Sequence, residues 1–251
     1  MITRFRFVLF AALLFVPVLR APAQSAPEVR QVEVRFACLR YAGDLRSVLT
    51  KPKPDQEPEE LRLYQGGFGQ PVTMMVENGS VSLYVKGESP DPKKPVFTPV
   101  ATAPIPAQGR EFTILLLPKG LRGEAAGPGY QPVVLPATNT FPFGDAMLLN
   151  LTKWNVRFDI GKKASVVSPT SQALVSFKGE VDEFNTAPVT VTVQTAPNQA
   201  VTLHTTRWIW HERTRHLAIV WLNQASQRPE ITTLKEVKGV EVPKPKEGGT
   251  P

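Results

Sequence analysis

Apolar and polar residues alternate with a period of two along much of this chain. Apolar side chains occupy every second position in residues 32–38, and valine alternates with threonine in residues 189–193. Side chains two positions apart share a face of a β-strand, so these runs predict strands with one buried face. Further strands are predicted at residues 61–64, 96–103, 112–117, 146–151, 156–160, 164–167, 173–177 and 217–222.

The dipeptide Asn78-Gly79 predicts a β-hairpin. It separates two strand-like runs, residues 72–77 and 80–86. Both central residues of a type I′ turn need a positive φ, which asparagine and glycine adopt at low energetic cost. We therefore expect the two runs to pair in an antiparallel manner.

Proline is spread through nearly every segment, with 25 prolines among 251 residues. Few windows remain in which a helix could run for three turns. Short strands at intervals of about 8–12 residues, joined by turn residues, favour a sandwich or a barrel. We predict an all-β fold, an antiparallel immunoglobulin-like β-sandwich built as two packed sandwich units.

Glycine-rich and proline-rich breaks indicate where the two units separate. One break covers residues 119–129 and another residues 141–144, so we place the boundary near Pro136–Phe143. The polar C-terminal end has too little apolar surface to offset the entropy of ordering. The predicted organisation is a leader over residues 1–23, sandwich units over 24–136 and 143–237, and a disordered tail over 238–251.

The first residues have the order of a secretory signal peptide. Arg4 and Arg6 precede an apolar run over residues 7–19, and the small residues around Ala23 follow. An uncleaved anchor is the alternative, but this run is shorter than the roughly 20 residues that span a bilayer. We expect cleavage after Ala23, no membrane span after cleavage, and a periplasmic or secreted product.

The net charge does not indicate a nucleic-acid partner. The chain has 29 basic and 22 acidic residues, and removal of Arg4, Arg6 and Arg20 with the leader leaves a net charge of +4. Such a balance favours solubility and lacks the dense basic face of nucleic-acid binders.

Cys38 is the single cysteine, so the chain cannot form an intramolecular disulfide. It occupies the last of the apolar positions in the alternating run 32–38. We therefore predict a buried structural thiol rather than a reactive one.

One segment concentrates residue types that often form sites. Residues 204–216, HTTRWIWHERTRH, contain all three histidines and two of the four tryptophans. A polar stretch over residues 212–215 separates two strand-like runs, which predicts a β-hairpin with a four-residue turn. His211 and His216 then flank the turn.

The histidines form an incomplete metal site. Structural zinc needs four protein ligands and catalytic zinc three, and His204 projects from the opposite strand face to His211. His211 and His216 remain weak metal candidates, with Glu212 as a possible third ligand. We expect no bound metal and no other cofactor.

The tryptophans leave two alternatives. Trp208 and Trp210 share a strand face, so they either pack between two sheets or stack on a sugar ring, with Arg207 or Arg213 nearby. For catalysis, the chain shows no nucleophile elbow, zinc-protease motif or phosphate-binding glycine loop. We expect no enzyme, although a hydrolase assembled from distant loops stays open, because catalytic triads are defined by geometry.

Residues 143–161, FGDAMLLNLTKWNVRFDIG, form an apolar strand ending in Asn150, a polar turn, and an alternating strand closed by glycine. This motif resembles the opening of small exported bacterial β-sandwich domains, including those similar to the periplasmic accessory protein of alginate acetylation. The resemblance covers residues 143–222, leaves residues 30–136 outside, and transfers no binding residues. It implies a non-catalytic immunoglobulin-like module that serves envelope or polymer assembly.

The expected function is that of an exported, non-catalytic structural or assembly factor of the bacterial cell envelope. Its expected partner is a protein or an envelope polysaccharide, and nucleic acid is not expected. The alternative is a carbohydrate-binding module that uses Trp208 and Trp210.

Overall fold

The structure of this chain is a computed structural model, and it is almost entirely β. Among the described residues it has seventeen strands and one short 3-10 turn, Lys178–Glu180. No helix in that part of the chain is long and apolar enough to cross a membrane. The predicted leader and the tail from residue 239 onward lie outside the described residues. The residues that the structure describes are 30–51, 57–91, 95–121, 128–136, 140–196 and 198–238.

The first half of the chain forms two sheets. One has the strand order β4-β1-β8-β9, with β5 also paired to β1, and the other has the order β3-β2-β6-β7. The strands are β1 (Arg30–Cys38), β2 (Ser47–Thr50), β3 (Glu59–Arg62), β4 (Gly67–Phe68), β5 (Val72–Val76), β6 (Ser80–Gly87), β7 (Val96–Pro104), β8 (Glu111–Pro118) and β9 (Tyr130–Leu135).

The second half of the chain also forms two sheets. Their strand orders are β13-β10-β16-β17 and β12-β11-β14-β15, and no described strand pairing joins the two halves. The strands are β10 (Asp145–Asn150), β11 (Asn155–Ile160), β12 (Lys163–Val167), β13 (Gln172–Ser176), β14 (Thr186–Ala196), β15 (Gln199–Ile209), β16 (Thr214–Asn223) and β17 (Arg228–Val237).

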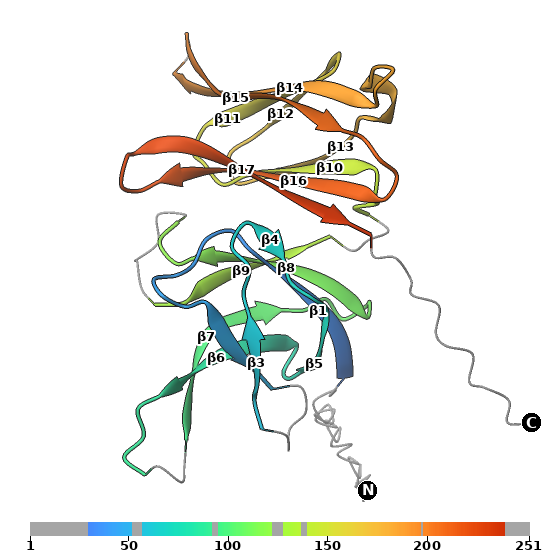
Figure 1. The fold of residues 1–251 in the computed structure, drawn as a ribbon. Helices are drawn as coiled ribbons and strands as arrows, with labels where there is room; N and C mark the ends of the chain where they lie inside the picture. The colour runs from blue at the N-terminus through green and yellow to red at the C-terminus, as the bar shows by residue number, and fades with distance from the viewer. Residues whose placement is uncertain are drawn as a thin grey trace, which may run out of the picture.

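The four sheets lie on top of one another as layers (Figure 1). Each half of the chain is a sandwich with its own apolar core. A third apolar cluster, which we call the inter-sandwich layer, lies between the sheet of β1 and β8 and the sheet of β10 and β16. Its buried residues are Ala37, Leu39, Leu115, Leu117, Leu121, Leu135, Phe141, Met147, Leu149, Leu151, Leu217, Ile219, Trp221 and Leu234. The all-β sandwich prediction is confirmed.

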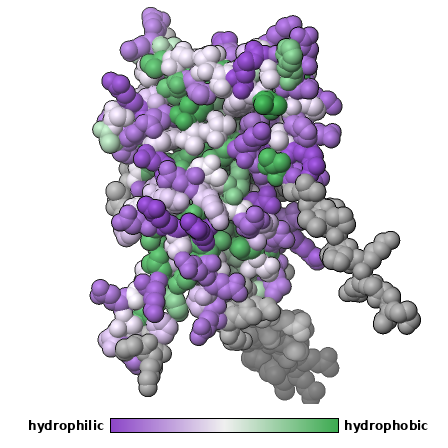
Figure 2. All heavy atoms as spheres, viewed as in Figure 1, coloured by the Kyte–Doolittle hydropathy of each residue, from purple (hydrophilic) through white to green (hydrophobic). Residues whose placement is uncertain are grey.

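The two sheets beside the inter-sandwich layer, here called the inner sheets, are buried on both faces. On β8, Ile114 and Leu116 face the core of the first sandwich, whereas Leu115 and Leu117 face the inter-sandwich layer. This explains why such strands are continuous apolar runs instead of alternating ones. Figure 2 shows mostly polar side chains on the visible outer surface, with apolar ones in small separate groups.

The two sandwiches repeat one topology. With β4 left aside, strands pair in the same order in both halves, and each inner sheet contains one parallel pair, β1 with β8 and β10 with β16. Equivalent hydrogen bonds follow these pairs: Leu39 N–H donates to the Leu116 carbonyl, and Leu151 N–H donates to the Val220 carbonyl. All the other described strand pairs are antiparallel, which agrees with the prediction of a mainly antiparallel fold.

The predicted hairpin over residues 72–86 is correct at its turn and wrong beyond it. Asn78 and Gly79 have φ values of 51° and 73°, and the Glu77 and Ser80 backbones exchange hydrogen bonds of 2.9 and 3.0 Å. However, β5 joins the sheet of β1, whereas β6 joins the sheet of β2. The two strands separate because both bury apolar side chains in the first core from opposite sheets.

Candidate functional site

Residues 204–216 do not form the predicted hairpin. β15 pairs with β14 in the outer sheet of the second sandwich, whereas β16 pairs with β10 and β17 in the inner sheet. The turn between β15 and β16 therefore crosses from one sheet to the other. The prediction was wrong because turn residues indicate where a strand ends, and not which sheet the next strand joins.

Trp208 packs in the core of the second sandwich. Only 5% of it is exposed, and its ring stacks on His216 with centroids 5.0 Å apart and planes 4° apart. Phe177 contacts the same indole edge-on at 6.0 Å. Trp208 thus packs between the two sheets, as the first of the two alternatives predicted. The His216 ring covers the indole face on which a sugar would stack.

The other three predicted ligand-binding residues each bind a different neighbour. The half-buried Trp210 donates from its indole N–H to the Gly144 carbonyl at 2.9 Å. Arg207 forms an ion pair with Asp182, and Arg213 donates to the Lys238 carbonyl at 3.2 Å. The structure therefore does not bring Trp208, Trp210, Arg207 and Arg213 together around one ligand.

The three histidines lie in different environments. His204 is half-buried on β15, His211 is exposed and accepts the Arg213 backbone N–H at its Nδ1 at 3.0 Å, and His216 is buried. Burial lowers the pKa of His216, and its Nε2 lies 3.3 Å from the Ile209 carbonyl oxygen. No group of three or more His, Cys, Asp or Glu side chains in the described ranges is arranged to hold a metal ion.

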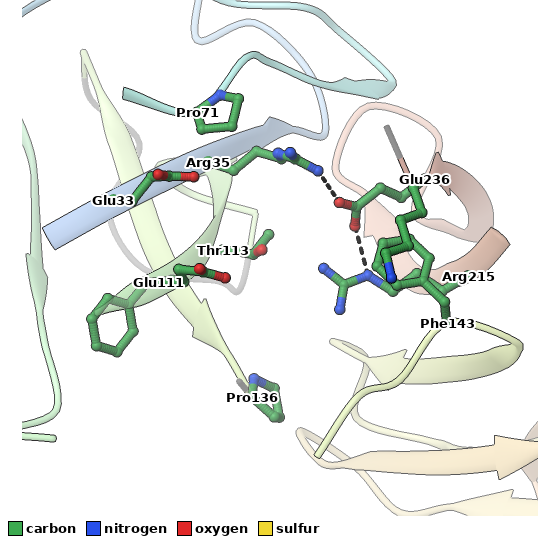
Figure 3. A pocket seen from close by; sticks show the side chains of 11 residues that line it. Glu33, Arg35, Pro71, Glu111, Thr113, Pro136, Phe143, Arg215 and Glu236 are labelled. Atoms are coloured by element: carbon green, nitrogen blue, oxygen red, sulfur yellow. Dashed lines mark hydrogen bonds and ion pairs between the residues drawn. The ribbon is translucent and has the colours of Figure 1, made fainter. Parts of the chain in front are cut away.

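The strongest candidate site lies between the two sandwiches. A cavity of about 210 Å³ opens at one end of the inter-sandwich layer, and we call it the inter-sandwich pocket. Strands β1 and β8 supply one side and β16 and β17 the other, as Figure 3 shows. The polar and charged residues that line it are Glu33, Arg35, Glu111, Thr113, Arg215, Glu236 and Lys238.

The inter-sandwich pocket forms where the strand faces change from apolar to polar. Every second residue of β1, β8 and β16 faces the space between the sandwiches. Along each strand these residues are apolar in the inter-sandwich layer and polar at the pocket. On each strand a polar residue at the pocket lies two positions before an apolar residue of the inter-sandwich layer. These pairs are Arg35 and Ala37 on β1, Thr113 and Leu115 on β8, and Arg215 and Leu217 on β16.

An Arg–Glu–Arg group joins the two sandwiches at the wall of this pocket. Glu236 of β17 accepts a hydrogen bond from Arg215 Nε at 2.6 Å and another from Arg35 of the first sandwich. The side chains of Arg215 and Glu236 are only 5% and 3% exposed. Because buried charges are tolerated only when paired, the three residues depend on one another.

The segment between the two sandwiches holds Arg215 in place. Arg215 Nη1 donates to the Phe141 carbonyl at 2.7 Å. The centre of the guanidinium lies 4.6 Å from the Phe141 ring centroid and 4.8 Å from that of Phe143. Such cation–π contacts, together with the ion pair, orient the guanidinium at the pocket wall.

Two carboxylates form the opposite wall. Glu33 and Glu111 are direct neighbours in the parallel pairing of β1 and β8, and both are exposed. Neither forms an ion pair with a described residue. In Figure 3 these two carboxylates lie on one side of the pocket, and the Arg35 and Arg215 guanidinium groups lie on the other.

Sequence analysis missed the inter-sandwich pocket because it requires strands from both halves of the chain. A local signal was nevertheless present at Arg215, a charged residue two positions before the apolar run 217–222. A charge at an inward-facing strand position needs a buried partner, and here that partner is Glu236.

A scan against models of known protein families finds no match to this sequence, and a search of curated proteins finds none either. The resemblance of residues 143–222 to exported envelope domains therefore stays a prediction.

Proposed function

We propose that this chain is an exported, non-catalytic β-sandwich protein that acts as a structural or assembly factor of the bacterial cell envelope. The observation that carries the proposal is the inter-sandwich layer, which joins two sandwiches into one body. The partner is a protein or an envelope polysaccharide that contacts the outer surfaces of this body.

The inter-sandwich layer supports a scaffolding role because it restricts motion between the units. Leu115, Leu217 and Ile219, which lie in this layer, are all 0% exposed. Domains of one chain move relative to each other unless their interface is large and apolar. Two outer sheets held at a fixed separation suit a protein that positions partners.

The carbohydrate-binding alternative receives less support from the same structure. Trp208 is in the core, and the Trp210 indole N–H is already bound by Gly144. The Lys178 ammonium also lies 5.3 Å from the Trp210 ring centroid. A sugar platform made of these two rings would require the second sandwich to open.

Deletion and complementation in a bacterium that encodes this chain test the proposal. Deletion should raise sensitivity to detergents, and the full chain should restore resistance in proportion to its amount, because a scaffold acts stoichiometrically. A chain without residues 1–23 should not restore resistance. Full restoration by trace amounts, or by the leaderless chain, would contradict the proposal.

Cleavage of the leader is a separate prediction. Arg4, Arg6 and the apolar run 7–19 should direct cleavage after Ala23, because this order of segments is what signal peptidase substrates share. Intact-mass analysis of the exported protein should show Gln24 as the first residue. Recovery of the full-length chain from the membrane fraction would disprove this prediction.

A further inference from the structure

The two walls of the inter-sandwich pocket carry opposite charges that its own residues leave incompletely paired. On one wall the carboxylates of Glu33 and Glu111 are adjacent and have no described ion-pair partner. Like charges directly opposite each other on neighbouring strands destabilise a sheet. A cationic group between these two carboxylates would remove that repulsion.

On the other wall, two guanidinium groups share one carboxylate. Lys238, which directly follows β17, also lines the pocket and adds a third cationic side chain. Arg215 uses Nε for Glu236 and Nη1 for the Phe141 carbonyl, and its Nη2 has no hydrogen-bond partner among the described residues. Arg35 is bound to Glu236 alone within the same part of the chain. This wall therefore retains guanidinium N–H donors, which favour a carboxylate or another planar anion.

The repeated topology places an acidic residue and a basic residue at equivalent positions of the two sandwiches. The equivalent hydrogen bonds of Leu116 and Val220 align β8 with β16. By this alignment, Glu111 and Arg215, each five residues earlier, occupy equivalent positions of the two sandwiches. Because the inner sheets face each other, one position supplies an acid to the pocket and its counterpart supplies a base.

We propose that the inter-sandwich pocket binds a small dipolar ligand of the amino-acid class. The ligand's carboxylate contacts Arg215 and Arg35, and its protonated amine contacts Glu33 and Glu111. This inference goes beyond the proposed envelope role, which does not require any small ligand. The cavity volume of about 210 Å³ limits the ligand to a small molecule and excludes a folded partner.

The charges on the two walls distinguish this ligand from simpler ones. A monocarboxylate leaves Glu33 and Glu111 facing each other, and a monoamine leaves the arginine donors without an acceptor. A divalent cation satisfies the two glutamates alone. Only a molecule with both charges contacts the paired glutamates and the arginines at once.

Titration calorimetry with the full mature chain tests the proposal. The dipolar probes are glycine, 4-aminobutyrate and 6-aminohexanoate, which differ in the separation of their charges, and the singly charged probes are hexanoate and hexylamine. The best dipolar probe should bind at least about tenfold more tightly than either singly charged probe, since one charge-assisted contact contributes about that factor.

Glutamine variants identify the wall that holds the amine. The double variant Glu33→Gln/Glu111→Gln should weaken binding of the best dipolar probe about tenfold or more. The matched control is Glu59→Gln/Glu60→Gln, which removes two adjacent exposed carboxylates of β3 outside the pocket and should leave binding unchanged. Arg35→Gln should also weaken binding, while Glu236 keeps Arg215 as its partner.

Several results would overturn the proposal. These are the absence of saturable binding by every dipolar probe, equal binding of hexanoate and 6-aminohexanoate, and unchanged binding in the Glu33→Gln/Glu111→Gln variant. Binding of Ca²⁺ at the two glutamates without any dipolar probe would replace the proposed ligand with a cation. Far-UV circular dichroism of each variant verifies that the fold is retained.

Discussion

At the scale of single residues, buried polar side chains have specific partners. Cys38 is 1% exposed, as the alternating pattern predicted, and burial raises the pKa of its thiol to about 11. The topological repeat places Asn150 at the equivalent position of the second sandwich, where it is 0% exposed. One repeat therefore fills this position with a thiol and the other with an amide.

His216 should make stability depend on pH. Burial lowers the pKa of His216 below the ordinary value of 6.5. Just below pH 6.5 the unfolded chain therefore binds a proton at His216 more readily than the folded chain does, which favours unfolding. The contribution of neutral His216 to the free energy of unfolding is complete above about pH 6.5. As the pH falls further, the free energy of unfolding decreases by at most about 1.4 kcal/mol per pH unit. Urea unfolding at neutral pH and at about pH 5 measures this difference in the free energy of unfolding.

The variant His216→Phe should lose this part of the pH dependence, since phenylalanine can stack on Trp208 without titrating. His211→Gln is the control, because His211 is exposed. An identical loss of stability on acidification in wild type and His216→Phe would show that another group is responsible.

Asn150→Ala should destabilise the second sandwich by about 3 kcal/mol, because it removes a buried network of hydrogen bonds. Asn155→Ala, an exposed position at the start of β11, should stay within about 0.5 kcal/mol of wild type. Equal effects in urea unfolding would contradict this role. Asn150 donates to the carbonyls of Trp154, Val167 and Ser168 at 2.7, 3.0 and 3.0 Å, and accepts from Thr152 N–H and Oγ1–H at 2.9 and 2.8 Å.

At the scale of strands, sequence patterns located most elements but not their partners. Alternation identified β1 and β14, and apolar runs identified β8, β10 and β16, because burial leaves a local pattern in each strand. The short β2 and β4 were missed, and so were β9 and β17. In β17 the inward Glu236 breaks the apolar pattern. Sheet assignment depends on contacts between distant segments, which explains why the strands of neither predicted hairpin pair with each other.

Hydrogen exchange should separate central strands of the inner sheets from the edges of the outer sheets. Backbone amides of β8 and β16 should exchange most slowly, because each strand has a partner on both sides and apolar cover on both faces. Amides of β3 and β12, at outer-sheet edges, should exchange much faster. Uniform protection across these four strands, measured by NMR or mass spectrometry, would contradict this order.

At the scale of the whole molecule, the inter-sandwich layer and the Arg–Glu–Arg group join the two halves. Alternation predicted neither of them, because it cannot show that the second face of an inner strand meets another sandwich. The prediction of two packed sandwich units did not specify which sheet of each unit would contact the other unit. These faces also determine the inter-sandwich pocket, whose walls come from strands far apart in the chain.

The two sandwiches should unfold together, in one calorimetric transition, because they share an apolar layer. Truncation inside this layer, Leu115→Ala/Leu217→Ala, should separate the transition into two. The control Leu116→Ala/Val220→Ala truncates one residue in each sandwich core and should lower the melting temperature while keeping a single transition. A single transition in the layer variant would show that the sandwiches are coupled by other contacts.

The inter-sandwich layer also determines when the growing chain is most vulnerable. β9 completes the first sandwich at Leu135, but the strands that cover its inner sheet come later, and the last of them, β17, ends at Val237. A chain that emerges from a ribosome or a translocon N-terminus first therefore carries an uncovered apolar face until the second sandwich has followed. Exposed apolar surface of this kind promotes aggregation of folding intermediates and attracts chaperones. The interval between the synthesis of these two strands is thus when the chain depends most on chaperones.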